Sequence, residues 1–466
     1  MKAQITVFIS MCLSSFIILV VSLCVICIAY SDGVRTQGCL DLGINSCLGE
    51  YSRELKEEYD LYYIDASYLG KQPSVENIKD RLEWYINENL VTNLNKSKAP
   101  WNRLQIDNIS VKRISAATAK GGVSLKHQAV EALNREGKQN RHDKEIANVL
   151  AQGNLDSLIN EEDVLGQWDE LMEIISGMPL PKRFNEEKKK YEEVELVNPA
   201  DSIYGICHSD ILYLALVDLS SISSAQISSD TLSSFSGVNE DSEFDTGGAD
   251  DSEFIEYLLE YMGDYQSYKD NRALRLELEY ILSGENNDYD NLCAAVKRIY
   301  NARLIDNFML AINDGGLWAE ARAIASSIEV CLLAPEFIEP VAKSLVYATA
   351  FIETASDIST IMKGGRVKLH KISSSMSVLK ALAGGIYDTN DPEGINYSEY
   401  ITAMLMLMDD RNRNYRAMDL MEMEIRKDTN NNMFSMGWCI ERMEGELIYT
   451  DSLNKTHTLK RIYGYY

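Results

Sequence analysis

The sequence predicts an α+β protein, predominantly helical, that begins with one transmembrane helix. Three patterns predict this architecture. Residues 5–30 form an uncharged apolar run, residues 254–426 show almost continuous helical periodicity, and the last thirty or so residues contain two extended segments. Because two strands alone are marginally stable, we expect a small antiparallel sheet that joins this C-terminal β-hairpin to membrane-proximal strands.

The N-terminal apolar run predicts a membrane anchor. Residues 5–30 contain no charged side chain, and a helix needs about 20 apolar residues to cross a bilayer. Residues 1–4 would then form a short cytoplasmic stub. A cleaved secretory signal has a shorter apolar region of about 7–15 residues, so an uncleaved anchor is favoured. Cleavage near residues 31–33 is the alternative.

The orientation of this anchor follows from what lies on either side of it. Lys2 is the one basic residue before the run, and Arg35 follows soon after it. A large C-terminal domain behind an N-terminal anchor is typical of an exported protein. We therefore expect a single-pass protein of the cell membrane, with a cytoplasmic N-terminus and an extracytoplasmic, extracellular ectodomain.

The charge balance limits the partners. The chain has 45 Lys and Arg against 71 Asp and Glu, a formal net charge of −26. Neutralising phosphates requires clustered Lys and Arg, so nucleic acid is not an expected partner. The expected partners are membrane lipid, through the N-terminal helix, and proteins of an envelope assembly.

The nine cysteines show no CxxC pair and no zinc-finger spacing. Cys39 and Cys47 are the closest pair outside the apolar run and are the candidate disulfide in an oxidising exterior. A domain of this size does not need a covalent link to hold its core, so free buried thiols are the alternative.

The membrane-proximal α+β region, residues 31–219, begins with two expected helices at residues 50–63 and 75–94. A strand with a bulge at Asp107-Asn108 is expected at residues 104–111, because branched apolar residues alternate there with one interruption. Residues 124–151 are polar, so a helix there is expected to be solvated or loosely packed. Residues 191–197 are expected to be a second strand of the sheet.

The rest of the ectodomain divides into three parts. Residues 220–253 are rich in Ser, Asp and Glu and predict an acidic linker or surface loop. Residues 254–435 predict a helical core, in which the apolar run 341–352 is too short for a second crossing and should be a buried helix. Residues 436–466 predict the C-terminal β-hairpin.

Local motifs offer no reaction centre. Residues 207–210, Cys-His-Ser-Asp, place a thiol, a base and an acid together, but sequence neighbours rarely converge on one substrate atom, so a thiol in a loop is favoured. Residues 241–246 and 388–394 resemble the start of an EF-hand loop, but in each the register of glycine and glutamate fails. No catalytic, cofactor-binding or metal-ligating residue is therefore predicted, and no cofactor.

Methionines recur along the expected helix 399–426. Their spacing at i, i+3, i+4 and i+7 fits either a partner groove or ordinary core packing, and core packing is the commoner explanation. A helix cap at Asn396 or Ser398 is expected to precede it.

Several segments resemble an uncharacterised family of exported, single-pass proteins of Gram-positive anaerobes, whose members are often encoded beside Flp-type (Tad) pilus genes. The segments that carry the resemblance are residues 2–10, 40–63, 276–284, 303–308, 351–368 and 397–427. The family's function is unknown. The pilin-like N-terminal segment implies a structural or assembly role and brings no catalytic residues.

The resemblance also implies a leader-processing site between Ala3 and Gln4. The family commonly has glycine where this chain has Ala3, and pilin-type processing cuts after that residue. After such a cut Phe8 would be the fifth residue, where typical pilins carry a glutamate. A major repeating pilin is therefore not expected.

Three functional hypotheses follow. The first is a non-enzymatic, membrane-anchored accessory or minor pseudopilin-like component of a Tad/Flp-type pilus or related surface assembly. The second is an adhesin-like extracytoplasmic binding module for a glycan, peptide or protein, since tyrosine-rich surfaces suit recognition. The third is an extracytoplasmic enzyme, which the absence of a local catalytic pattern disfavours.

Overall fold

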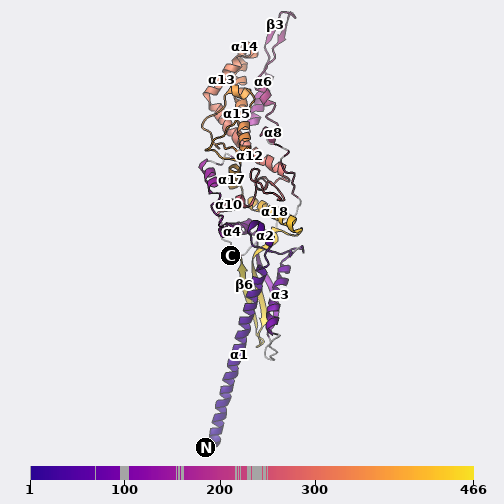
Figure 1. Ribbon diagram of the computed structural model, residues 1–466, viewed down its shortest axis with the longest axis vertical. Coiled ribbons are helices and arrows are strands. Elements are labelled where there is room, and N and C mark those ends of the chain that lie inside the picture. The colour runs from indigo at the N-terminus through magenta and orange to yellow at the C-terminus, as the bar shows by residue number, and fades with distance from the viewer. Residues whose placement is uncertain are drawn as a thin grey trace. The chain divides into compact units, whose positions relative to one another are not determined.

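The computed structural model describes residues 2–465, with the exception of 69, 95–103, 154, 156–157, 159–161, 216–217, 219, 221, 228–231, 233–243, 245–247 and 249 (Figure 1). The chain forms two compact units, each discontinuous in sequence. The sheet unit comprises residues 1–137, 228–250 and 410–466, and the helical unit comprises residues 138–227 and 251–409. The architecture is α+β and mostly helical, as predicted.

The N-terminal helix α1 (Lys2–Leu48) is longer than predicted. It continues past Tyr30 without a break because no proline interrupts it, and Thr36 returns a hydrogen bond to the carbonyl of Asp32 at 2.8 Å. Its first half exposes large apolar side chains, from Ile5 to Ile26, whereas its last turns are buried in the sheet unit. Among the described residues, α1 is the one helix long and apolar enough to cross a membrane.

The sheet of this unit is antiparallel and is assembled from both ends of the chain. Its central strand is β5 (Cys439–Thr450), which pairs along one edge with β2 (Gln105–Ala116). The other edge of β5 pairs with β6 (Thr456–Gly464) and, at its start, with the short β1 (Ile64–Asp65). The terminal hairpin, its membrane-proximal partner strand and the bulge after Ile106 are therefore confirmed.

Helix α1 and α3 (Val75–Leu94) pack on this sheet through aliphatic side chains. Gly445 makes the close approach feasible, because a Cβ atom at this position would lie 2.9 Å from Ile44 Cδ1. The buried aliphatic residues of this core include Leu40, Ile44, Ile78, Leu82, Ile86, Ile109, Met443 and Leu447. The second half of α1 is thus an integral part of a folded core.

The remaining helices of the sheet unit are α2 (Arg53–Tyr59), α4 (Ala119–Glu136) and α18 (Asp410–Thr429). The expectation of a solvated helix after residue 124 is wrong for α4, which packs on α18. Its small and aliphatic side chains, such as Ala129 and Leu133, are fully buried or nearly so and outweigh the polar composition of the segment.

The helical unit is organised around α15 (Ile338–Met362), which is buried from Ser344 to its end. This confirms a buried helix at residues 341–352. Helices α6 (Val164–Gly177), α12 (Asp288–Asn313), α13 (Gly315–Ser326) and α16 (Val378–Leu382) pack against it. The other helices of this unit are α5 (Asp143–Ala151), α7 (Asp201–Tyr204), α8 (Ile211–Leu214), α10 (Asp251–Tyr261), α11 (Glu277–Ser283), α14 (Glu329–Leu333) and α17 (Tyr397–Leu407).

Two predicted elements differ from the structure. The strand expected at residues 191–197 is β4 (Lys190–Glu193), which pairs with its sequence neighbour β3 (Lys182–Asn185) as a separate hairpin rather than with the C-terminal strands. The helix expected at 399–426 is interrupted at Met408, whose ψ of 148° is extended, so that α17 and α18 belong to different units. The linker expected at 220–253 lies mostly outside the described residues.

Candidate functional site

A loop between α10 and α11 is held in place by buried carboxylates. Glu277 accepts the backbone N–H of Gly263 at 2.8 Å. Glu279 accepts the N–H of Tyr265 at 2.8 Å and the hydroxyl of Tyr397 at 2.7 Å, through the same oxygen. Because these two glutamates lie in the first turn of α11, they fix the loop to that helix, with Tyr265 half-buried and its ring centroid 5.8 Å from that of Tyr397.

Glu279 has an unusual protonation equilibrium. Burial, and then the charge of Asp264, raises the pKa of Glu279 from 4.5 to about 8. Its second oxygen, Oε2, is buried and has no hydrogen-bond partner among the described residues, so no donor stabilises a negative charge on this atom. The loop is therefore held by a group that is largely protonated near neutral pH.

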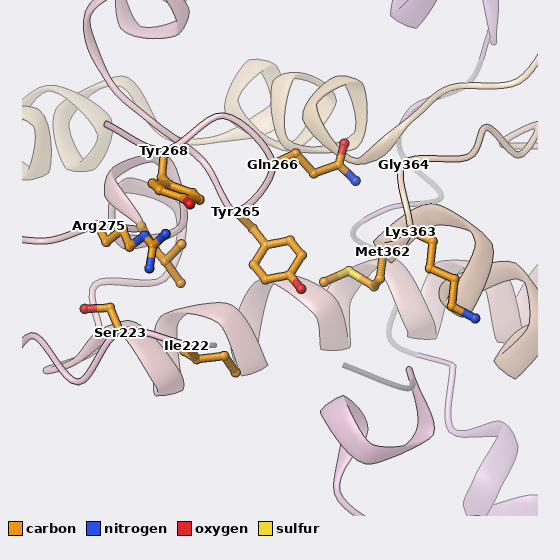
Figure 2. A pocket seen from close by; sticks show the side chains of 10 residues that line it. Ile222, Ser223, Tyr265, Gln266, Tyr268, Arg275, Met362, Lys363 and Gly364 are labelled. Atoms are coloured by element: carbon orange, nitrogen blue, oxygen red, sulfur yellow. The ribbon is translucent and has the colours of Figure 1, made fainter. Parts of the chain in front are cut away.

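The same loop forms one wall of a cavity of about 460 Å³. Figure 2 shows Tyr265 between the thioether of Met362 and the pair formed by Arg275 and Tyr268. The guanidinium carbon of Arg275 lies 3.3 Å from the centroid of the Tyr268 ring. The cavity thus combines two aromatic rings with a cation, the kind of lining that binds a polar ligand by stacking and hydrogen bonding.

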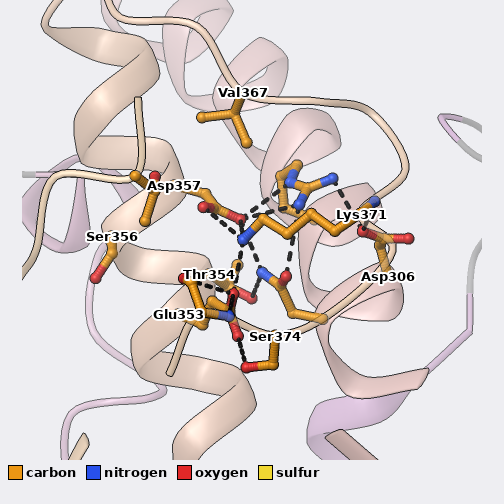
Figure 3. A network of polar contacts seen from close by, with 12 residues as sticks. Asp306, Glu353, Thr354, Ser356, Asp357, Val367, Lys371 and Ser374 are labelled. Atoms are coloured by element: carbon orange, nitrogen blue, oxygen red, sulfur yellow. Dashed lines mark hydrogen bonds and ion pairs between the residues drawn. The ribbon is translucent and has the colours of Figure 1, made fainter. Parts of the chain in front are cut away.

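A buried polar network joins α12 to α15 in the helical unit (Figure 3). Arg303 and Asp357 are both fully buried, and the guanidinium donates to Asp357 at 3.0 and 3.2 Å. Asn307 donates to the same carboxylate at 2.9 Å. Burial alone would raise the pKa of Asp357, but the charges of Arg303 and Lys371 hold it below its ordinary value.

Lys371 connects this network to the loop that follows α15. Its ammonium group donates to Glu353 at 2.9 Å and to Asp357 at 2.8 Å, and both carboxylates come from successive turns of α15. Glu353 also accepts the hydroxyl of Ser374 at 2.5 Å and the N–H of Ser375 at 3.0 Å. The buried end of the network therefore fixes the position of residues 371–375.

The chemistry of this network is structural. Two cations, Arg303 and Lys371, face two buried carboxylates, Asp357 and Glu353, with Asp306 at the margin 3.2 Å from Arg303. Each charge is compensated by an opposite charge and by hydrogen bonds, which is the condition for keeping ions inside a protein. The network supports the surrounding loops, and Lys371, one of its members, is partly exposed.

The Cys-His-Ser-Asp segment does not form a reactive site. Burial raises the pKa of the Cys207 thiol to about 12, so the thiolate is disfavoured. His208 contacts Asp169 at 3.0 Å, and Asp210 caps α8 by accepting from Leu212 at 2.9 Å. The interpretation of a thiol in a loop therefore fits the structure.

The methionines of α17 and α18, such as Met404, are buried, which supports core packing.

The structure corrects the candidate disulfide. Cys39 and Cys47 are both free and buried, and they lie on the same helix, α1. Eight residues of helix rise about 12 Å, which is beyond the separation that a disulfide allows.

Ala3 and Gln4 lie at the start of α1, and leader processing there stays a prediction. Of the two EF-hand-like segments, 241–246 lies mostly outside the described residues, whereas 388–394 forms turns that lead to the Asn396 cap of α17.

Sequence reasoning missed the residues that shape this site. A signal for the polar network was present: Glu353 and Asp357 lie inside an apolar helical run, and buried carboxylates require a cationic partner. The sequence does not show which of its 45 basic residues supplies the partner. The cavity residues Tyr265 and Arg275 carry no spacing signal, because a loop rather than a helix or strand brings them together.

The architecture defines a class of protein: a largely helical unit and an antiparallel sheet unit whose core includes the continuation of a candidate membrane helix. The chain belongs to a family of unknown function, DUF5702, which matches residues 187–451. No curated protein and no solved structure matches the chain. The matched region contains Glu279, Arg303, Asp357 and the first cavity.

Proposed function

We propose that this protein is a non-enzymatic, membrane-anchored accessory or minor pseudopilin-like component of a Tad/Flp-type pilus or a related surface assembly. The observation that carries the proposal is the construction of α1. Its first half presents apolar side chains to its surroundings, and its second half is buried against β5 and β6. The apolar half of α1 and the turns that pack in the sheet unit therefore belong to one continuous helix.

A continuous helix does more than attach a domain to a membrane. A flexible linker would leave the ectodomain free to rotate, whereas an uninterrupted helix fixes the depth and orientation of the sheet unit relative to its anchor. A subunit of an ordered assembly needs a fixed depth and orientation, whereas a tethered enzyme does not. The sequence resemblance to pilin-like N-terminal segments supports the same role.

The rigid connection can be tested without removing the anchor. Insertion of Gly-Ser-Gly-Ser after Tyr30 separates the apolar half of α1 from the turns that pack on the sheet, beginning at Asp32. We expect the variant to reach the membrane and fold but to lose surface filaments or filament-dependent adhesion, counted by electron microscopy. A matched insertion in the β5–β6 turn, after Leu453, is the control. Normal filaments in the first variant, or in a deletion strain, would contradict the proposal.

A second candidate is an adhesin-like extracytoplasmic binding module. The cavity of Figure 2, with Tyr265, Tyr268 and Arg275 exposed to a ligand, is the observation that favours it. The two roles are compatible, because an accessory subunit can also present a binding site. Retention of a soluble ligand by the full-length protein in detergent is the test, and it is independent of filament counts.

A further inference from the structure

The cavity of Figure 2 continues into two neighbouring cavities. Lys363 and Gly364 line both the first cavity and a second one of about 520 Å³. Asp388 and Asn390 line both the second cavity and a third one of about 470 Å³. Since consecutive cavities share lining residues, the three lie side by side along the segment that follows α15, and we refer to them together as the groove. A groove of three successive compartments suits an extended ligand rather than a single small molecule.

Aromatic rings and hydrogen-bonding groups recur along this groove. Tyr265 and Tyr268 line the first compartment, and Tyr387 lines the second. Ser359 also lines the second compartment: it is 1 % exposed, and its hydroxyl has no hydrogen-bond partner among the described residues. A buried hydroxyl without a partner is costly, so this atom is suited to meet a polar ligand or a water that a ligand displaces.

The groove also holds lysines without an ion-pair partner. Within the part of the chain that the structure describes, neither Lys363 nor Lys380 forms an ion pair with a carboxylate, whereas the charge of Arg275 acts on the nearby carboxylate of Asp288. Arg275 stacks on Tyr268, and the ammonium of Lys380 lies 4.2 Å from the centroid of the Tyr387 ring. In a chain with a net charge of −26, two unpaired lysines and Arg275 along one groove suit a ligand that brings its own negative charge.

We propose that this groove binds an acidic polysaccharide, with successive sugar units in the three compartments. The ring faces of Tyr265 and Tyr387 would stack on the C–H faces of sugars, and Arg275, Lys363 and Lys380 would pair with carboxylate or sulfate groups. The inference rests on the binding role proposed above as the second candidate, and it names the ligand class of that site.

The lining favours a glycan over an acidic peptide. Peptides are usually held by pairing with a strand edge or by placing apolar side chains in pockets. Most of the described lining of the second and third compartments is hydroxyl, lysine or carboxylate (Asp388 and Asp391), with one amide, one tyrosine and four apolar residues, Val367, Ile372, Ile386 and Pro392. These carboxylates suit sugar hydroxyls as hydrogen-bond acceptors, and they would repel an acidic peptide.

The polar network of Figure 3 has a place in this arrangement. Lys371 and Ser375 line the third compartment, and both are held by Glu353. The network therefore fixes one wall of the groove from inside the helical unit. A site that is held by buried ion pairs is preorganised, which lowers the entropy cost of binding a flexible polymer.

The test uses full-length protein in detergent and four probes: oligogalacturonate, dextran sulfate, neutral dextran and oligoglutamate. We expect binding of an anionic glycan that weakens with added salt, and about tenfold weaker binding or worse in the double variant Lys363→Met/Lys380→Met. The matched control is Lys182→Met/Lys188→Met, which removes the same charge from the β3–β4 hairpin of the same unit and should leave binding unchanged.

Each other outcome decides against the proposal. Equal affinity for neutral dextran, or tighter binding of oligoglutamate, would overturn the acidic-glycan assignment while leaving a binding role intact. Unchanged affinity in the groove variant would place the glycan elsewhere. Retention of none of the four probes would overturn the groove proposal and the binding role together, without bearing on the filament experiment.

Discussion

Two interfaces of this chain, one in each unit, are packed differently. The sheet unit packs α1 and α3 on its sheet through aliphatic side chains such as Leu40 and Ile44. The α12–α15 interface of the helical unit instead buries Arg303, Asp357 and Glu353. An aliphatic core is held by non-directional burial and tolerates rearrangement, whereas a buried ionic network demands defined geometry and fixes the loops that it contacts. The groove lies in the unit that contains the second interface.

The sharpest test of this difference removes one charge from the network. We expect Asp357→Ala to destabilise the protein by about 3–5 kcal/mol, because Arg303 would stay buried without its main counter-charge. The double variant Arg303→Met/Asp357→Leu should recover much of this loss, since it removes both charges. Chemical denaturation of the full-length protein in detergent measures both effects. A double variant as unstable as the single one would contradict the account.

The aliphatic core should respond to lost volume rather than to lost charge. Ile44→Ala is expected to cost about 2–4 kcal/mol in free energy of unfolding, because Ile44 is fully buried against the sheet beside Gly445. Ile17→Ala, in the exposed apolar half of the same helix, is the matched control and should leave this stability unchanged. Equal effects of the two variants would mean that α1 does not contribute to the core.

The helical unit should also carry a pH dependence that comes from Glu279. Its folded pKa lies above its ordinary value, so its stabilising contribution is fully present below about pH 4.5 and is lost as the pH rises toward about 8. Glu279→Gln keeps the acceptor for Tyr397 and Tyr265 but cannot ionise. We expect this variant to be more stable than the wild type at pH 8.5, by on the order of 2 kcal/mol, and similar at pH 5. Identical pH profiles in thermal denaturation would refute this assignment.

The smallest expected effect concerns the start of α17. Asn396 and Glu399 form a reciprocal capping box, in which Asn396 accepts the N–H of Glu399 at 2.9 Å and Glu399 accepts the N–H of Asn396 at 2.8 Å. Asn396→Ala should cost about 1 kcal/mol in free energy of unfolding, and Asn396→Asp should cost much less because it retains a cap. Equal losses in urea denaturation would show that the cap does not matter here.

Local pattern predicted the elements whose signal is local. The bounds of α3, the hairpin of β5 and β6, the bulge after Ile106 and the cap at Asn396 were all predictable, because periodicity, turn residues and capping chemistry lie within a few residues of the element. The pairing of β2 with β5 was expected because the two strands of the C-terminal hairpin are marginally stable without a further strand. The assignment of residues 191–197 to that sheet was wrong, because β4 forms its backbone hydrogen bonds with β3, its neighbour in sequence.

The sequence by itself determined that the chain has an apolar N-terminal helix, an acidic surface and a mostly helical α+β architecture, since composition and periodicity encode burial directly. Tertiary structure decided that α1 continues into the core of the sheet unit and that Arg303 and Lys371 are the partners of Asp357. It also decided that Tyr265 and Tyr387 line two neighbouring cavities that share Lys363. These facts depend on which distant residues meet, and a long-range contact is chosen by the packing of the whole unit rather than by any local pattern.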